Sequence, residues 1–409
     1  MRWATGPLRS RNFQLLLACD VISLAGTSIA YVAIPFAVLS IRGSGSDVGY
    51  VATAGLLPLV VFLLLGGVVA DRLPRHQVMV AADLLQGAAQ AASAVLVLTG
   101  TARVWELLAC AALRGTGLGF YYPASAGLLP QTIPDGQRAQ AVAIDRVGRN
   151  GANIAGAALG GILVGLAGPG WGLAADAASF GAAALLRVGM RLPARLPPAE
   201  PASILRELRE GWREFASRRW LWSIVLQFAG LTAVTSATIS VLGPVVADRS
   251  LGGARTWGFL LAAYGAGSVI GGLAMIRFRP SRMLLAASIG VLILPLLLFA
   301  LAVPLPVPVI AAVAFISGVG GELFTVLWIL TMQQEIPSGA LSRVSAYDAL
   351  GSYALAPVGT AVAGPLLTVF GPPAVLYAGG ALIILLTLLV LTVPEVRNMR
   401  RRPVPGPEP

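Results

Sequence analysis

Three ionisable residues lie deep within long apolar stretches of this chain: Asp20, Arg114 and Glu322. Ionisable groups are costly inside a membrane and mark pathways for ions or substrates by default. Glu322 has no basic residue within one helical turn. The polar residues after Asp20 recur every three or four positions and predict one polar helix face: Ser23, Thr27 and Tyr31. We hypothesise that Glu322 and Asp20 exchange protons and that Arg114 tunes them; for Asp20 and Arg114, structural ion pairing with neighbouring helices is the alternative.

The composition predicts an all-α integral membrane protein. Hydrophobic residues make up 56% of the 409 residues and charged residues 11%, against about 25% charged in soluble domains. Stretches near the roughly 20 residues that span a bilayer predict twelve transmembrane helices, at about 12–41, 47–70, 77–99, 103–130, 138–167, 171–190, 220–247, 255–277, 282–301, 306–335, 342–370 and 373–393.

Arginine placement predicts the orientation of these spans. All basic residues other than the single His are arginine, and most lie in the amino-terminal segment, the even-numbered loops, the central linker and the carboxyl tail. Positive charge is retained on the cytoplasmic side, so we expect both termini there. The net charge of +11 is explained by this topology, and we expect no nucleic-acid binding. The arginine-only composition suggests a bacterial cytoplasmic membrane.

The chain contains an internal duplication. The run Ile133–Gly136 recurs with one substitution at Ile336–Gly339, and several glycines and one aspartate, Asp145 or Asp348, follow each copy at the same spacing. Duplicated halves in an apolar chain are typical of secondary transporters. We therefore expect a six-helix bundle at 1–190, a cytoplasmic linker with an amphipathic helix at 191–219, a second bundle at 220–393 and a disordered cytoplasmic tail at 394–409.

A short motif follows the second span. The loop contains Gly67, Asp71, Arg72 and Arg75, and this pattern resembles the signature loop of the major facilitator superfamily. The resemblance implies a cytoplasmic latch that pairs in only one of two conformations; a solvated, positively charged loop is the alternative. The second half carries Arg277 but no acid at the equivalent place. Asp145, Arg149 and Asp348 are predicted near the same cytoplasmic side. We therefore assign them to the latch together with the four loop residues.

The resemblance also implies which spans line a central substrate cavity. In this superfamily spans 1, 4, 7 and 10 line the central cavity, and Arg114 matches a span-4 arginine linked to coupling. The implied cavity residues are Ser23, Thr27, Tyr31, Tyr121, Gln227, Thr325 and Trp328. More narrowly, the run Leu8–Phe13 and the segment Ala81–Leu84 look like the bacterial enterobactin exporter and macrolide efflux branch. We expect Asp83 and Asp176 to be structural.

Several function classes are excluded or disfavoured. The chain has no lysine and therefore no phosphate-binding loop of the Walker type, and one His with scattered acids supplies neither a metal centre nor an enzyme active site. The sequence predicts a monomeric secondary transporter in the lipid bilayer, which exports amphipathic small molecules such as drugs, macrolides or siderophores and uses a proton gradient rather than a cofactor. A proton-coupled nutrient importer and a non-transporting scaffold or sensor are the alternatives.

Overall fold

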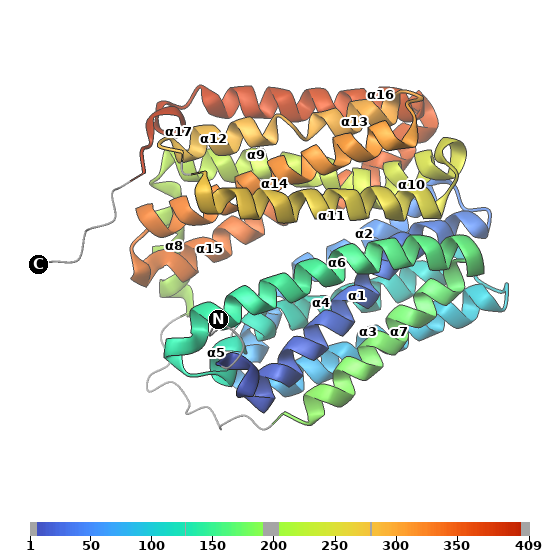
Figure 1. Cartoon of the computed structure of the whole chain (residues 1–409), viewed down its shortest axis with the longest axis horizontal. Coiled ribbons are helices and arrows are strands. Elements are labelled where there is room, and N and C mark those ends of the chain that lie inside the picture. Colours follow the sequence, from blue (N-terminus) through green and yellow to red (C-terminus); the bar gives the residue numbers. More distant parts are fainter. Residues whose placement is uncertain (1–5, 127, 191–203, 279, 402–409) are drawn as a thin grey trace, which may run out of the picture. The chain divides into compact units, whose positions relative to one another are not determined.

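The computed structural model of the chain describes residues 6–126, 128–190, 204–278 and 280–401, and within these ranges the secondary structure is helical. The first half contains α1 (Arg11–Ser40), α2 (Gly45–Arg72), α3 (Arg75–Leu98), α4 (Val104–Ala126), the short α5 (Leu129–Thr132), α6 (Arg138–Ala167) and α7 (Pro169–Val188) (Figure 1). The amphipathic linker helix predicted from the sequence is α8 (Ile204–Ala216).

The second half continues with α9 (Arg219–Ala237), which passes through π-helical turns into α10 (Gly243–Val246), and α11 (Ala254–Arg277). The remaining helices are α12 (Met283–Val291), α13 (Pro295–Ala302), α14 (Val307–Glu335), α15 (Ser338–Tyr353), α16 (Ala356–Leu391) and α17 (Pro394–Asn398). α16 bends at Gly371, whose positive φ of 77° requires a glycine. That glycine lies between the last two predicted spans.

The prediction of an all-helical chain with membrane-spanning helices is confirmed, but the number of spans is not. Among the described residues, nine helical stretches are long and apolar enough to cross a bilayer: Arg11–Ser40, Gly45–Leu63, Arg75–Leu98, Gln140–Ala167, Arg219–Leu251, Ala254–Arg277, Met283–Ala302, Val307–Glu335 and Arg343–Leu391. The count of twelve spans in two bundles, the predicted domain limits and the orientation of the termini stay predictions.

The chain forms two compact units. Unit 1 comprises 1–197, 239–262 and 360–369, and unit 2 comprises 198–238, 263–359 and 370–409. In unit 1, α2 packs on α4, α1 packs on α6 and α7, and α3 packs on α4 and α7. In unit 2, α14 packs on α12 and α13, and α15 packs on α8 and α9.

Glycines permit the closest helix contacts in each unit. In unit 1, Gly115 of α4 packs against the backbone of Gly55 in α2, so that a methyl group at 115 would overlap the Gly55 carbonyl. In unit 2, Gly318 of α14 packs in the same way on the carbonyl of Tyr264 in α11. Small residues let helix backbones approach in a bilayer, where van der Waals packing drives association. Gly115 and Gly318 also correspond in the internal duplication, so the two halves share this packing device.

The linker helix α8 packs on α15 through an aromatic cluster. Trp212 stacks on Phe215 at 5.7 Å between ring centroids, and both rings contact Tyr347 of α15. Arg343 Nη1 lies 2.9 Å from Glu210 Oε2 beside this cluster. Part of the apolar face of this amphipathic helix is therefore buried within unit 2.

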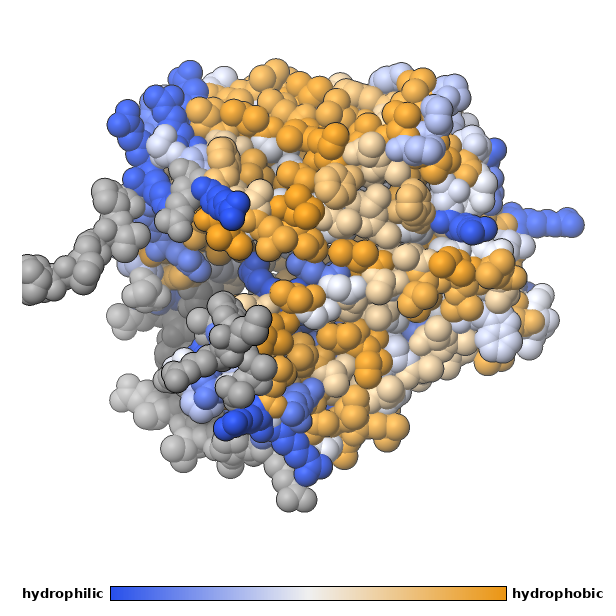
Figure 2. Space-filling view, in the orientation of Figure 1, coloured by the Kyte–Doolittle hydropathy of each residue, from blue (hydrophilic) through white to orange (hydrophobic). Residues whose placement is uncertain are grey.

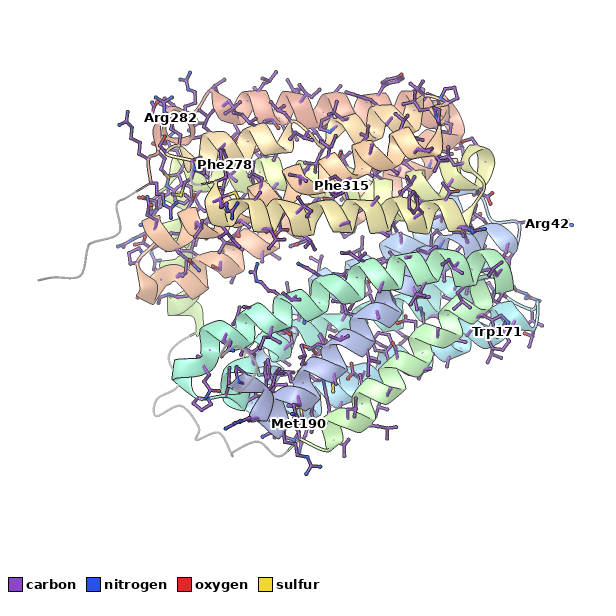
Figure 3. All side chains as sticks on the ribbon, viewed as in Figure 1. Arg42, Trp171, Met190, Phe278, Arg282 and Phe315 are labelled. Atoms are coloured by element: carbon purple, nitrogen blue, oxygen red, sulfur yellow. The ribbon has the colours of Figure 1, made fainter. Side chains whose placement is uncertain are left out.

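Apolar side chains dominate the surface between the helix ends. In Figure 2 the visible face of α11, α12, α13 and α16 in unit 2 is mostly hydrophobic, and hydrophilic residues gather near the helix ends. Large aliphatic side chains such as Leu166 and Leu185 of unit 1 are more than three-quarters exposed, at 79% and 78%. Within unit 1, Arg42 and Trp171 mark one end of the helices and Met190 the other (Figure 3). This pattern is that of helices in contact with lipid.

Candidate functional site

A buried ion cluster joins four helices of unit 1. Arg187 of α7 is fully buried, and its Nη1 donates to Oδ2 of Asp83 on α3. Its Nη2 donates to Oδ1 of Asp20 on α1 and to the hydroxyl oxygen of Tyr121 on α4, each over 2.8 Å. The Tyr121 hydroxyl donates to the same Asp20 oxygen over 3.0 Å. We call Asp20, Asp83, Tyr121 and Arg187 the ion cluster.

A second arginine balances the charge of the second carboxylate in the cluster. Arg149 of α6 lies with Nη1 3.2 Å from Asp20 Oδ2, and its side chain is 35% exposed, against 7% for Asp20. Two guanidinium groups therefore face two carboxylates, which makes the charges tolerable inside a helical bundle. The planar fork of Arg187 allows one side chain to bind both carboxylates. Asp145 and Arg149 are four residues apart, a spacing that allows a bridge along one helix. The structure instead pairs Arg149 with Asp20, and Asp145 Oδ1 has no hydrogen-bond partner among the described residues.

The polar face of α1 extends beyond the ion cluster. Ser23 is buried, Thr27 is half-buried and Tyr31 is 43% exposed. The guanidinium carbon of Arg114 lies 6.0 Å from the centroid of the Tyr31 ring, within the range of a cation–π contact. The structure thus brings Asp20 together with Tyr121, and Tyr31 together with Arg114, as two separate polar sites.

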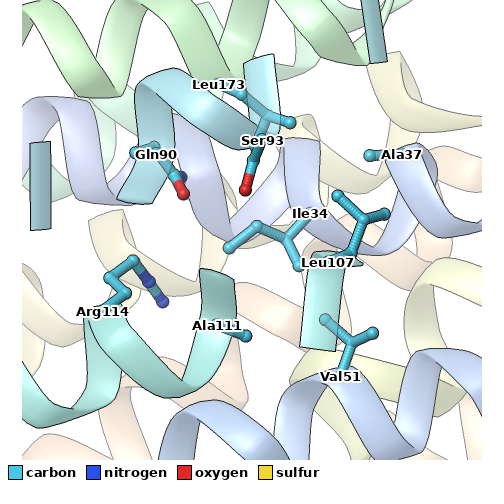
Figure 4. A pocket seen from close by; sticks show the side chains of 9 residues that line it. All are labelled: Ile34, Ala37, Val51, Gln90, Ser93, Leu107, Ala111, Arg114 and Leu173. Carbon is cyan, nitrogen blue, oxygen red and sulfur yellow. The ribbon is translucent and has the colours of Figure 1, made fainter. Parts of the chain in front are cut away.

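A small cavity lies inside unit 1 beside Arg114. Its walls are mostly apolar, and three polar side chains reach it, Arg114 from α4 with Gln90 and Ser93 from α3 (Figure 4). The residues that line it are Ile34, Ala37, Val51, Gln90, Ser93, Leu107, Ala111, Arg114 and Leu173. Its volume is about 20 Å³, which is room for about one water molecule and not for a drug-sized ligand.

The predicted site residues of α14 in unit 2 face different surroundings. Glu322 is half-buried, and its side chain lies against Gly271 and Gly272 of α11. Thr325 is exposed, and its hydroxyl donates to the Gly321 carbonyl oxygen over 3.0 Å. The two glycines of α11 therefore leave the space that the carboxyl-bearing side chain occupies.

One turn further along α14, Trp328 contacts a carboxylate. Its indole Nε1 donates to Oδ2 of Asp348 on α15 over 3.1 Å, and Ser352 Oγ lies 3.3 Å from Asp348 Oδ1. A predicted cavity residue and a predicted latch residue thus bind each other. Trp328 is buried and stacks on Phe324, and it contacts Trp220 of α9 edge to face. This series of rings anchors α9 to α14.

Gln227 forms a hydrogen bond between two uncharged side chains. It is buried on α9, and its Nε2 donates to the Thr387 hydroxyl of α16 over 2.8 Å. In the duplication, α9 corresponds to α1 and the end of α16 corresponds to α7, the two helices joined by Asp20 and Arg187 in the first half. An amide–hydroxyl pair therefore joins, in the second half, the two helices whose counterparts an ion pair joins in the first.

The residues of the predicted latch lie at the end of α2 and the start of α3. The side chain of Asp71 is outside the described part of the structure; Arg72 is exposed and Arg75 is half-buried. Among the described atoms, a methyl group on Gly67 would meet nothing within 4 Å, whereas one on Gly66 would overlap the carbonyl of Gly119 in α4. At this end of α2, the glycine that packs closely on a neighbouring helix is therefore Gly66.

Sequence reasoning missed Arg187 and Gln90. Arg187 lies near the end of a predicted span, where topology alone accounts for an arginine, although Leu186, Val188 and Met190 make its sequence surroundings apolar. That apolar context was the available signal. Gln90 carries no charge and stands among alanines, so nothing local distinguished it from a packing residue.

The fold is shared with solved structures of membrane transporters. The chain is similar to a nucleoside transporter, NupG, with a TM-score of 0.70 at 13% identity over 96% of this chain and 99% of the other. It is also similar to a bacterial homologue of the human lysosomal transporter Spinster, with a TM-score of 0.68 at 16% identity over 95% and 96% of the two chains.

The family follows from the sequence. Residues 2–312 match the transmembrane secretion effector family, and the chain belongs to this branch of the major facilitator superfamily. Similar characterised proteins include the multidrug efflux pump Tap of Mycobacterium tuberculosis, 26% identical over 95% of both chains. The enterobactin exporter EntS of Escherichia coli is 28% identical over 96% of this chain and 94% of its own. The protein is a membrane transporter and not an enzyme.

Proposed function

We propose that the protein is a proton-coupled exporter of amphipathic small molecules that works by alternating access in a bacterial cytoplasmic membrane. Export is supported by the relatives along nearly the whole chain, one named as a multidrug efflux pump and the other as an enterobactin exporter. The substrate class is accordingly drug-like or siderophore-like. The proton gradient is the energy source that fits a lysine-free chain with ionisable side chains within its spans.

The ion cluster is the observation that carries the coupling proposal. Asp20 shares its two carboxylate oxygens between Arg187, which is buried, and Arg149, which is partly exposed. In this proposal, protonation of Asp20 releases Arg149 before Arg187. The Arg149 pair is the weaker of the two, because it is longer and its guanidinium is partly exposed to solvent. In this scheme Glu322 carries a proton in unit 2, and Arg114 tunes the carboxyls of unit 1.

The packing within unit 1 supports alternating access. Two segments of the second half of the sequence, 239–262 and 360–369, belong to unit 1. A methyl group on Gly258 would lie 2.6 Å from the Ala157 carbonyl oxygen of α6, and the hydroxyls of Thr53 and Thr360 are 2.9 Å apart. Each of these two contacts joins a segment of the first half of the sequence to a segment of the second half. Both contacts must separate if the two halves rock about a central site. We assign them as the gate that opens outward, and the α2–α3 loop as the cytoplasmic latch.

Proton flux in proteoliposomes tests this function. Macrolides, lipophilic cations, catechol siderophores and sugars are added one at a time, and proton movement is recorded with the wild type and Glu322→Gln. We expect flux with members of the first three groups, and its loss in Glu322→Gln, because the amide cannot carry the proton. Flux with sugars alone would favour a nutrient importer, and wild-type flux in Glu322→Gln would refute the assignment of Glu322.

A further inference from the structure

The carboxyl-terminal segment after α16 folds back onto the loop between α11 and α12. The backbone N–H of Arg401 donates to the Ser281 carbonyl oxygen over 2.8 Å. The carbonyl oxygen of Arg400 accepts from Gln334 Nε2, at the end of α14, over 3.1 Å. Earlier in the segment, Val396 of α17 is fully buried, and α17 packs on α12. Parts of unit 2 that are far apart in sequence are therefore held together at this end of the helices.

This arrangement brings five arginines to the end of α11 and the start of α12. Two come from residues 277–282 and three from the carboxyl-terminal segment, and we call them the basic patch: Arg277, Arg282, Arg397, Arg400 and Arg401. The first four are exposed and the last is partly exposed. Figure 3 shows Arg282 and Phe278 at this end of the helices, and hydrophilic residues gather there in Figure 2. Within the part of the chain that the structure describes, none of the five guanidinium groups forms an ion pair.

Two acids lie beside the basic patch, and each accepts a hydrogen bond from an uncharged donor. Glu395 is the one acid among residues 394–401, and its Oε2 accepts the backbone N–H of Trp220, at the start of α9, over 3.0 Å. Glu335 Oε1 accepts the amide of Gln334 over 2.8 Å. Residues 277–282 contain no acid. With two carboxylates beside five guanidinium groups, the patch keeps a net positive charge.

An apolar surface continues from the basic patch along α11, which is long and apolar enough to span a bilayer. Leu273, Ile276 and Phe278 are 55%, 66% and 52% exposed. Apolar faces of spanning helices contact acyl chains, and aromatic rings at helix ends lie at the level of the lipid headgroups. Topology alone accounts for arginines beside a span, but not for a segment that hydrogen-bonds to the loop and adds three more arginines there.

We propose that the basic patch binds the phosphate of an anionic phospholipid, whose acyl chains cover the exposed apolar face of α11. A soluble phosphate would satisfy the arginines alone, whereas a lipid also covers Leu273 and Ile276. Guanidinium groups suit this ligand, because each can donate two hydrogen bonds to one phosphate. The bound lipid holds the carboxyl-terminal segment in place against α12. This site is separate from the transport function proposed above, since it needs no transported substrate.

Native mass spectrometry of the full-length protein in detergent measures this binding, because it counts the lipids retained as lipid is added. The probes are anionic phosphatidylglycerol and zwitterionic phosphatidylcholine, with sn-glycerol 3-phosphate as the soluble competitor. The test variant removes three charges and leaves the backbone hydrogen bonds of the segment in place: Arg397→Gln, Arg400→Gln and Arg401→Gln. The control removes the same charge at exposed positions of unit 1: Arg42→Gln, Arg103→Gln and Arg249→Gln.

We expect the wild type and the control to bind phosphatidylglycerol more tightly than phosphatidylcholine. An arginine beside an anionic headgroup contributes about fivefold to affinity, so the test variant should lose about 100-fold for phosphatidylglycerol, with phosphatidylcholine binding unchanged. Arg397→Gln alone should lose about fivefold and tests the same claim if the triple variant does not fold. Wild-type phosphatidylglycerol affinity in these variants, or an equal loss in the control, would overturn the proposal. Displacement of the lipid by an equal concentration of sn-glycerol 3-phosphate would also overturn it, because the ligand would then be a soluble phosphate.

Discussion

Removal of Arg187 should destabilise unit 1 more than removal of any exposed arginine. In Arg187→Met, Asp83 loses the one guanidinium that pairs with it among the described residues, whereas Asp20 keeps Arg149 at 3.2 Å. Breaking a buried ion pair by deleting one partner costs about 3–5 kcal/mol, because the other charge stays buried. The double variant Arg187→Met with Asp83→Asn removes both charges and should recover most of that loss.

Thermal unfolding in detergent micelles, followed by size-exclusion chromatography of the heated protein, measures the effect. Arg282→Met is the control, since Arg282 is exposed just before α12 and surface substitutions usually change stability by no more than about 0.5 kcal/mol. We expect the order of melting temperature to be wild type and Arg282→Met, then the double variant, then Arg187→Met. A single variant as stable as the wild type would refute a structural ion cluster, and a double variant no better than the single would refute charge compensation as its cause.

Two further predictions concern packing and the gate. Gly66→Ala should lower the melting temperature, because its methyl group overlaps the backbone of α4, whereas Gly67→Ala meets open space and should match the wild type; equal loss in both would contradict the assigned contact. With the native cysteines replaced, Thr53→Cys combined with Thr360→Cys should form a disulfide under oxidation and stop transport until a reductant is added, because those hydroxyls are 2.9 Å apart. If the fully cross-linked protein still transported at the wild-type rate, positions 53 and 360 would not need to separate during transport, and the assigned gate would be wrong.

The helices were predictable because each carries its own signal. Apolar runs bounded by arginines, glycines and prolines predicted the helical stretches, and the charged and apolar spacing of 204–216 predicted α8. Gly371 lies between the last two predicted spans, and its positive φ of 77° interrupts the helical backbone of α16 at that point. The surroundings of α8 were not predictable, because its aromatic partner Tyr347 lies far along the chain.

The site was less predictable because its partners come from helices distant in sequence. Asp20 was identified from its own helix, but the arginine that holds it lies 167 residues away. Asp176 was expected to be structural, and its hydrogen-bond partner Gln90 likewise comes from another helix. Local spacing shows that an ionisable residue is in a span, while its pairing depends on how helices pack.

Transport direction and energy source together test the central claim most directly. Everted membrane vesicles that contain the wild-type protein are given ethidium and an acidic interior, and accumulation is followed before and after nigericin, which exchanges protons for potassium. The account predicts accumulation that collapses when the pH gradient is removed and that is absent from vesicles lacking the protein. Ethidium uptake that persists without the gradient, or that occurs only in right-side-out vesicles, would contradict a proton-coupled exporter.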